Sequence, residues 1–425
     1  MNAYAPQAQE PTPDDLVQRL ARARVPFAAM VGTYALEVFN DQFLKQTAML
    51  LAIATLGAAW QGYIQVTFML SFVLLAAPAG WLADCFAKRT VVIGSKALEL
   101  LAVLIGAAGL LSGNWTIILL GIAIMGLRGT IFGPAMNGSI PELYPDSHVT
   151  KANGLLKMFT TAASLLGIAF AGFALDVHGL ALGVPKGHAI VAAGIVLVAL
   201  IGIGVSQWLP RRVAAAPETP FPKRGPWETI DTLLRVRADH LLAVVIAADA
   251  YFWFLGALLV QLINKLGLAQ FGYSTSLTSC LVIAEVVGVA IGGILSAKLA
   301  TGPRWHRVLA PAAWGIGGFL LLLIGVPSLP TSLHLDALLL SLALAGIAGG
   351  LFLIPLESFI QVRPAPAEKG SIISAANFAA FTGMLLAGPA SIFLNRTLLP
   401  TVSMALIGGV TLLVGVWLHV QLSKQ

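Results

Sequence analysis

The sequence predicts an all-α membrane protein with twelve transmembrane helices in two pseudo-symmetric six-helix bundles. Of its 425 residues, 58% are hydrophobic and only 10% are charged, with a mean hydropathy of +0.87, whereas a soluble domain has about 25% charged residues. The apolar residues fall in runs of about 20, enough for an α-helix to cross a ~30 Å hydrocarbon layer. The longest polar break, residues 210–239, divides these runs into six and six.

Each predicted span is an apolar run bounded by polar or charged residues. Residues 1–25 are predicted to be a cytoplasmic segment, and residues 26–209 and 240–425 the two bundles. The spans are expected at 26–53, 62–83, 90–111, 115–137, 152–175, 188–209, 240–264, 275–299, 308–327, 334–357, 371–394 and 400–422.

The break at 210–239 is predicted to be a cytoplasmic linker with a short helix on the membrane surface. It contains five prolines and then "WETIDTLLRVR", whose apolar residues Trp227, Ile230, Leu233 and Leu234 fall on one helical face.

The distribution of Lys and Arg predicts the orientation. With a cytoplasmic N-terminus, the inner segments hold eighteen basic residues, while the outer loops hold only Lys186, Lys265 and Arg396. Because cytoplasmic loops of membrane proteins are enriched in Lys and Arg, both termini are expected inside. The net charge of +6 is therefore attributed to membrane orientation, and no nucleic-acid partner is expected.

Two short patterns recur across the midpoint. "GWLADCFAKR" (80–89) closes the second span and "GILSAKLATG" (293–302) closes the eighth. "GTIFGPAMNGS" (129–139) ends the fourth span and "GLFLIPLESFI" (350–360) ends the tenth, with Pro134 matching Pro355. Matching halves of this kind are typical of transporters built from parallel repeats.

Several ionisable residues fall near the centres of the predicted spans, where such groups usually mark a functional site. In "EVFNDQFLKQ", Glu37, Asp41 and Lys45 follow each other at intervals of four and form one stripe, which is expected to face the interface between the halves. The other central charges are Glu99, Arg128, Asp249 and Glu285. The five acids outnumber Lys45 and Arg128, so the surplus is expected to need protons, water or a cationic ligand group.

Structural roles remain open for these charges. Asp41 and Lys45 neutralise each other in one alternative, and Arg128 braces Glu37 or Glu99 in another. Lys96 and Lys157 lie near helix ends, so their side chains are expected to extend toward the membrane interface.

The turn "DCFAKR" is predicted to form a conformational latch from Gly80, Asp84, Lys88 and Arg89. Gly80 is expected to allow close approach of helices. The alternative for the two basic residues is a cytoplasmic turn that only sets the orientation.

The sequence does not predict an enzyme or a cofactor. No glycine-rich stretch forms a phosphate loop, and no His is spaced with another His, Cys or Glu as a metal site would require. No cofactor and no metal are therefore expected.

These motifs resemble those of a known family. "GWLADCFAKR" is similar to the signature loop of the major facilitator superfamily, with Ala87 where Gly is common. "FNDQFLKQ", "FGPAMNGSIPEL", "KANGLLKM", "YFWFLGA", "PLESFIQ" and "AANF" occur in order through both halves and resemble the lysophospholipid transporter family within that superfamily.

The resemblance implies a transporter that moves lyso-phosphatidylethanolamine and related lysolipids from the outer to the inner leaflet of a bacterial inner membrane. A separate cytoplasmic acyltransferase would then re-acylate the lipid, and the transporter would be a monomer. Asp41 matches the family's acid in the first helix, and Asn153 and Asn377 match its asparagines. Met136 and Gln261 stand where relatives often carry a base, which leaves the headgroup preference open.

The substrate is expected to bind between the halves. An acid, Asp41 or Glu37, would take the ammonium group, and a base, Arg128 or Lys45, the phosphate. The full predicted set is Glu37, Asn40, Asp41, Lys45, Arg128, Asn153, Asp249, Trp253, Gln261, Glu285 and Asn377.

Two other functions remain open. A proton-coupled exporter of drugs or small metabolites would have the same fold, and its transport would collapse with a protonophore. A non-transporting scaffold that docks a partner enzyme would move nothing in liposomes.

Overall fold

A computed structural model of the protein describes residues 13–423 except 145, 182, 215, 301, 303, 366 and 367. The first half comprises α1 (Pro13–Thr55), α2 (Trp60–Leu74), α3 (Ala76–Cys85), α4 (Lys88–Ser112), α5 (Trp115–Asn137), α6 (Ile140–Leu143), α7 (Asp146–Leu175), β1 (Leu180–Ala181), β2 (Val184–Pro185) and α8 (Lys186–Ser206).

The second half follows a linker that contains α9 (Pro226–Val236). It comprises α10 (His240–Lys265), a π-helical turn (Leu266–Gln270), α11 (Thr275–Leu299), α12 (Leu309–Leu322), α13 (His334–Val362), α14 (Lys369–Thr397) and α15 (Pro400–Leu422). Short 3₁₀ segments lie at Trp305–Val308, Leu323–Ser328 and Thr331–Leu333.

The fold is an all-α membrane architecture in two six-helix bundles. In the described part of the chain, ten helices are long and apolar enough to cross a membrane, and α2 with α3 makes an eleventh. The twelfth is α1, whose 43 residues suffice to cross a membrane and which packs between α7 and α8. Its charged residues explain its lower hydropathy.

The second span is bent. The sequence predicts one helix over 62–83, but α2 and α3 meet at an angle of 53°. Pro78 explains the break, because its ring has no N–H to donate to the carbonyl of Leu74 and clashes with it.

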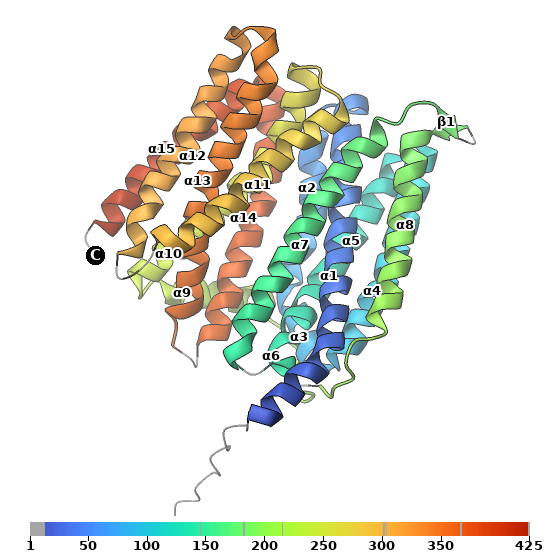
Figure 1. The fold of residues 1–425 in the computed structure, drawn as a ribbon, viewed down its shortest axis with the longest axis vertical. Helices are drawn as coiled ribbons and strands as arrows, with labels where there is room; N and C mark the ends of the chain where they lie inside the picture. Colours follow the sequence, from blue (N-terminus) through green and yellow to red (C-terminus); the bar gives the residue numbers. More distant parts are fainter. Residues whose placement is uncertain are drawn as a thin grey trace, which may run out of the picture.

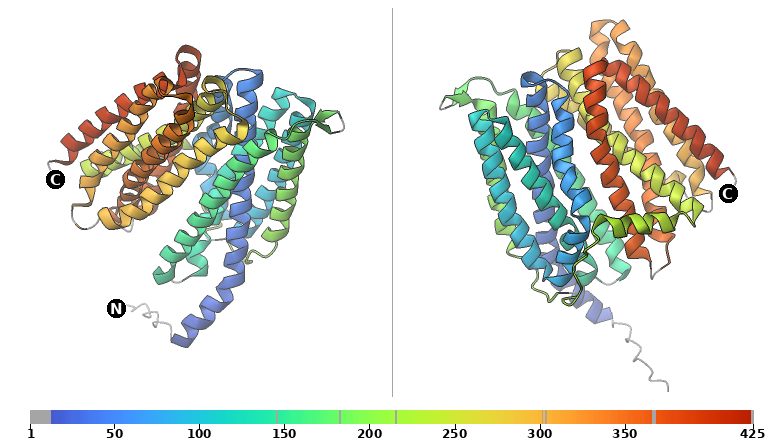
Figure 2. Two further views of the ribbon diagram at one scale, coloured as in Figure 1. Left: turned by 45° about the horizontal axis from the view of Figure 1, so that its top comes forward. Right: turned by 180° about the vertical axis from the view of Figure 1, so that it is seen from behind.

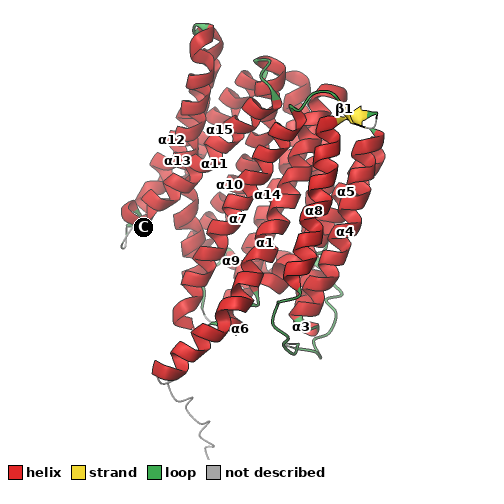
Figure 3. Ribbon diagram, turned by 45° about the vertical axis from the view of Figure 1, so that its right-hand side comes forward, coloured by secondary structure: helices red, strands yellow, loops and turns green. Residues whose placement is uncertain are grey.

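The halves lie side by side, blue to green and yellow to red (Figure 1). Each has its own apolar core, and α7 packs against α11 and α2 against α14 across the seam. The short β1–β2 hairpin lies at one end of the molecule, the hairpin end, at the top of Figure 1 (Figure 3). The opposite end, the α9 end, carries α6 and α9.

The linker helix α9 crosses the second half and contacts α14 (Figure 2). Trp227 and Leu234, two residues of the apolar face, are 65% and 49% exposed. Exposed apolar side chains on such a helix suit a position in the membrane interface.

Glycines set the contact between α11 and α13. A Cβ on Gly292 would stand 1.9 Å from the carbonyl oxygen of Ile347, and one on Gly346 would stand 2.1 Å from that of Glu285. Small residues let transmembrane backbones approach this closely.

We therefore expect Gly292→Ala to destabilise the protein by about 3 kcal/mol, the upper range for overpacking. Gly133→Ala is the matched control, because nothing lies within 4 Å of a Cβ at that position in α5. It should be neutral or up to about 1 kcal/mol stabilising, since alanine favours helix over glycine. Unfolding in SDS measures both, and equal midpoints for the two variants would contradict the prediction.

Candidate functional site

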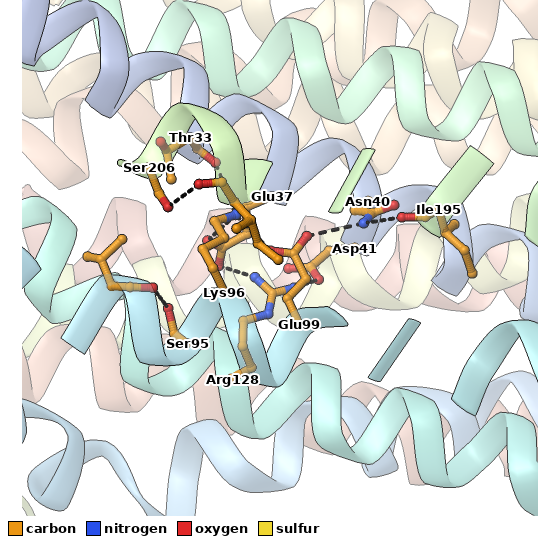
Figure 4. A network of polar contacts seen from close by, with 12 residues as sticks. Thr33, Glu37, Asn40, Asp41, Ser95, Lys96, Glu99, Arg128, Ile195 and Ser206 are labelled. Carbon is orange, nitrogen blue, oxygen red and sulfur yellow. Dashed lines mark hydrogen bonds and ion pairs between the residues drawn. The ribbon is translucent and has the colours of Figure 1, made fainter. Parts of the chain in front are cut away.

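A buried network of charges lies in the first half (Figure 4). Arg128 on α5 is fully buried and forms ion pairs with Glu37 and Asp41 of α1. Since an unpaired charge in the membrane interior is costly, the two carboxylates and the guanidinium stabilise one another in this bundle.

Lys96 on α4 is the second cation of the network. Its Nζ lies 2.7 Å from Oε2 of Glu99 and 3.5 Å from Oε2 of Glu37, and it donates to the carbonyl oxygen of Thr33 at 3.3 Å. The expectation that Lys96 extends to the membrane interface is wrong: its side chain is only 1% exposed. The ion pairs with two buried carboxylates stabilise the ammonium more than hydration at the membrane interface would.

Lys96 also changes the balance of charges. Glu37, Asp41 and Glu99 face the cations Lys45, Lys96 and Arg128, so α1, α4 and α5 carry three central charges of each sign. The predicted surplus of acids is therefore wrong for this half. The remaining central acids are Asp249 and Glu285 of the second half.

Asn40 ties the network to α8. Its Nδ2 donates to Oε1 of Glu99 at 3.1 Å and to the carbonyl oxygen of Ile195 at 3.0 Å. This buried amide fixes the orientation of Glu99 relative to α1 (Figure 4).

Only one edge of the network is accessible. The side chain of Asp41 is 16% exposed, compared with 4% for Glu37 and 0% for Arg128. Lys45, one turn along α1, is half-buried, with its Nζ 5.0 Å from the ring centre of Phe68. Asp41 pairs with Arg128 and forms no ion pair with Lys45, so the stripe carries a paired acid and a separate base.

The two central acids of the second half, Asp249 and Glu285, form no such ion pairs among the described residues. Asp249 is 4% exposed and its Oδ1 has no hydrogen-bond partner. Glu285 is also buried, and among the described residues neither carboxylate has a cation within 4 Å. Lys157, also expected to reach for the interface, is exposed, and its Nζ lies 5.8 Å from the ring centre of Trp253 across the seam.

Three other predicted site residues lie apart from the charges. Gln261 is buried at the hairpin end, where its Nε2 donates to the carbonyl oxygen of Ala257 at 2.9 Å. Asn153 and Asn377 are exposed on α7 and α14 toward the α9 end.

The predicted latch residues contact the first half and the linker. Lys88 donates to the carbonyl oxygen of Gly138 at 2.8 Å, and Arg89 donates to that of Gln207 at 3.0 Å. Asp84 is exposed and its carbonyl oxygen accepts from Ala216 in the linker. Nothing lies within 4 Å of a Cβ on Gly80, so the expected close helix approach there is wrong.

An amide cluster at the hairpin end joins the halves. Asn264 exchanges hydrogen bonds with Gln46 at 2.8 and 3.3 Å and donates to Gln61 at 3.1 Å, and Gln61 donates to the carbonyl oxygen of Gln261. The sequence does not single out these residues, because isolated amides in apolar runs have no distinctive spacing.

Asp176 fastens the same end. Its carboxylate accepts the backbone N–H of Thr275 at 3.0 Å and that of Ser276 at 2.9 Å, and it also accepts both hydroxyls. Burial acts to raise the pKa of Asp176, but the hydrogen bonds from Ser276 and Thr275 outweigh it and lower the pKa to about 2. The negative charge also suits the N-terminus of α11.

Asp176→Asn is expected to weaken the closure of the hairpin end by about 1 kcal/mol, the upper range for a charge at a helix N-terminus. Ser279→Cys reports opening, because Ser279 is buried beside Gly172 at this seam. In a background without Cys85 and Cys280, labelling of that cysteine should rise about fivefold.

The pH dependence follows from the lowered pKa. The contribution of Asp176 to closure is complete above its ordinary pKa of about 4 and is lost as the pH falls toward 2. Because labelling of any thiol slows as the pH falls, the two proteins are compared at each pH: the ratio of the labelling rate with Asp176 to that of the Asn variant should rise toward one over that window. Parallel profiles would contradict the assignment.

Comparison with known proteins identifies the family. The sequence matches the Major Facilitator Superfamily over residues 27–389. The chain belongs to the major facilitator superfamily.

Among curated superfamily members, the chain is similar to the lysophospholipid transporter LplT of Yersinia pestis (strain Pestoides F). The identity is 28% over 352 residues, which cover 82% of this chain and 81% of the relative. The chain has the same identity and coverage with LplT of Yersinia pseudotuberculosis serotype O:3 (strain YPIII).

Solved structures of superfamily transporters share the fold. A bacterial homologue of the human lysosomal transporter Spinster, in an inward-facing and unoccupied conformation, matches with a TM-score of 0.68 and 17% identity, covering 95% of both chains. The nucleoside transporter NupG matches with a TM-score of 0.68 and 14% identity, covering 94% of this chain and all of that one.

Proposed function

We propose that this superfamily transporter moves lysophospholipids from the outer to the inner leaflet of a bacterial inner membrane by alternating access. The similarity to LplT across 82% of the chain and the order of the shared motifs support the substrate class. The excess of basic residues in the inner segments supports a cytoplasmic α9 end with both termini inside.

The accessible edge of the charged network carries the proposal. Asp41 is the most accessible acid of the network, and Lys45 is a base one turn away with no ion-pair partner in the described ranges. A zwitterionic headgroup presents the opposite pair, an ammonium and a phosphate. Arg128 is enclosed, so it acts by holding Asp41 in place.

The contacts between the halves support a structure closed at the hairpin end. Asp176, the amide cluster and the close approach of Gly62 to Gly388 all lie across the seam there. Alternating access requires these contacts to break when the site opens outward, with Gly80, Asp84, Lys88 and Arg89 as the proposed latch at the α9 end.

Translocation of lyso-phosphatidylethanolamine in proteoliposomes tests the function. Fluorescent lysolipid placed in one leaflet should cross faster with the protein than in protein-free liposomes, while a two-chain phosphatidylethanolamine should not. Equal rates for all three samples would overturn the proposal and favour a scaffold. The product in the inner leaflet would be a substrate for a separate cytoplasmic acyltransferase.

The second half supports a second candidate, a proton-coupled exporter of drugs or small metabolites. Asp249 and Glu285 are buried carboxyls that form no ion pair among the residues that the structure describes, and such groups carry protons in pumps and transporters. Transport under a proton gradient, with and without a protonophore, separates the two candidates. A rate of lysolipid movement that does not change when the gradient is collapsed argues against the exporter.

A further inference from the structure

An apolar cavity of about 500 Å³ opens at the hairpin end, away from the charged network. The ends of α1 and α7 form its wall in the first half, and the π-helical turn after α10 forms its wall in the second half. Most of this wall is aliphatic, as shown by Leu50, Leu51, Leu175, Val177, Leu268 and Ala269. Its volume lies within the ~300–1,000 Å³ typical of ligand pockets.

The cavity lies at the seam that Asp176 fastens. Leu175 and Val177 flank Asp176, and Thr275, which donates to its carboxylate, also lines the cavity. A ligand here would touch both halves at the point where they must separate.

A cation stands at the rim. Lys186 lies between the lining residues Pro185 and Gly187, and its Nζ is 3.5 Å from the position of a Cβ on Gly179, a third lining residue. His178 and His188 also line the cavity, and Nδ1 of His188 lies 3.2 Å from the carbonyl oxygen of Leu110 on α4. This rim is suited to an anionic group beside an apolar tail.

Lys186 differs from the other two basic residues predicted in the loops of this end. Lys265 donates to the carbonyl oxygens of Asn395 and Leu398 at 2.8 and 2.9 Å, and Arg396 donates to the hydroxyl of Tyr63 at 3.2 Å. Lys186 is exposed, and its side chain has no polar partner among the described residues. Its ammonium is therefore available to a ligand.

We propose that this cavity is the first docking site for the lysophospholipid, with the acyl chain inside and the phosphate at Lys186. The proposal rests on the proposed function and adds a site that precedes the central charges. Each methylene buried here gains about as much as in a membrane, so a cavity without charged lining can compete with the leaflet for one chain.

Photolabelling in nanodiscs tests the site with the full chain. The probe is lyso-phosphatidylethanolamine with a diazirine at the end of its acyl chain. Label is expected in the peptides containing residues 50–54 and 268–269. Label spread over lipid-facing helices, with none concentrated in these peptides, would overturn the proposal.

Filling the cavity should remove the label. Ala269→Trp, and Ala54→Trp as a second variant if the first does not fold, should lower labelling of the opposite wall about tenfold, because the indole takes the space of the acyl chain and overpacking an apolar site is unfavourable by at least that factor. Ala108→Trp is the matched control on an exposed position of α4 and should stay within about twofold. Equal labelling in all three variants would refute the cavity as the binding site of the acyl chain.

Lys186→Gln tests the rim. It should raise the lysolipid concentration for half-maximal labelling about threefold, as for an exposed ion pair, and it should remove the salt dependence of that value. An unchanged, salt-dependent value would exclude Lys186 as the phosphate contact.

The outcomes separate this site from the function. Cavity labelling without any translocation of lysolipid in liposomes would support docking and overturn the transport. Normal translocation without the labelling pattern would leave the transport in place and overturn the docking site.

Discussion

Asp41→Asn is expected to lower lysophospholipid transport, measured as kcat/KM in proteoliposomes, by about 10- to 100-fold. The range corresponds to a charge-assisted hydrogen bond of about 1.5–3 kcal/mol. Asp41 is the acid that combines exposure with an ion pair to a fully buried base. The Asn side chain keeps the shape but cannot attract the ammonium of the headgroup.

The variants around Asp41 separate binding from folding. Asp336→Asn, an exposed acid at the start of α13, should stay within about twofold, as expected for a surface substitution. Lys45→Gln should mainly raise KM for the zwitterionic lipid. Normal transport by both Asp41→Asn and Arg128→Gln, at normal expression, would show that the charges only stabilise the fold.

Lys96→Met is expected to lower the free energy of unfolding by about 3–5 kcal/mol, the cost of removing one partner from a buried ion pair. The methionine fills similar space but leaves Glu99 without its ion-pair partner and Glu37 with Arg128 alone. Unfolding by SDS titration in detergent measures the loss.

A double variant tests the cause of that loss. Lys96→Met combined with Glu99→Gln removes both charges of the closest pair and should recover at least about half of the stability, since a matched neutral pair avoids the uncompensated charge. Lys298→Met, at an exposed position near the end of α11, should change the free energy of unfolding by less than about 0.5 kcal/mol. A double variant as unstable as the single one would mean that packing by the lysine stem dominates.

The boundaries of several spans can be predicted from hydrophobicity and from the residues that begin helices. The predictions 115–137, 275–299 and 400–422 match α5, α11 and α15, because Asn114, Ser274 and Pro400 stand at their starts, where N-cap residues and proline are favoured. The bend at Leu75 was missed, although Pro78 marks it in the sequence.

The sequence predicts only part of the site. The stripe of Glu37, Asp41 and Lys45 was visible from spacing along one helix, as was the depth of Arg128. Lys96 was assigned to the interface because its position near a helix end gives no information about which neighbours it faces. Asp176 and the amides of Gln46, Gln61 and Asn264 were missed for the same reason: their partners lie in the other half.

By itself, the sequence determined the membrane class, the paired six-helix bundles and the charges that lie at mid-span, because hydrophobic length and helical spacing depend on neighbours along one chain segment. Only the tertiary structure decided which charges neutralise one another, which acid remains accessible and which end of the seam is closed. These depend on distances between helices that are far apart in sequence, and a difference of a few ångströms there decides whether a buried charge is paired or free to bind a ligand.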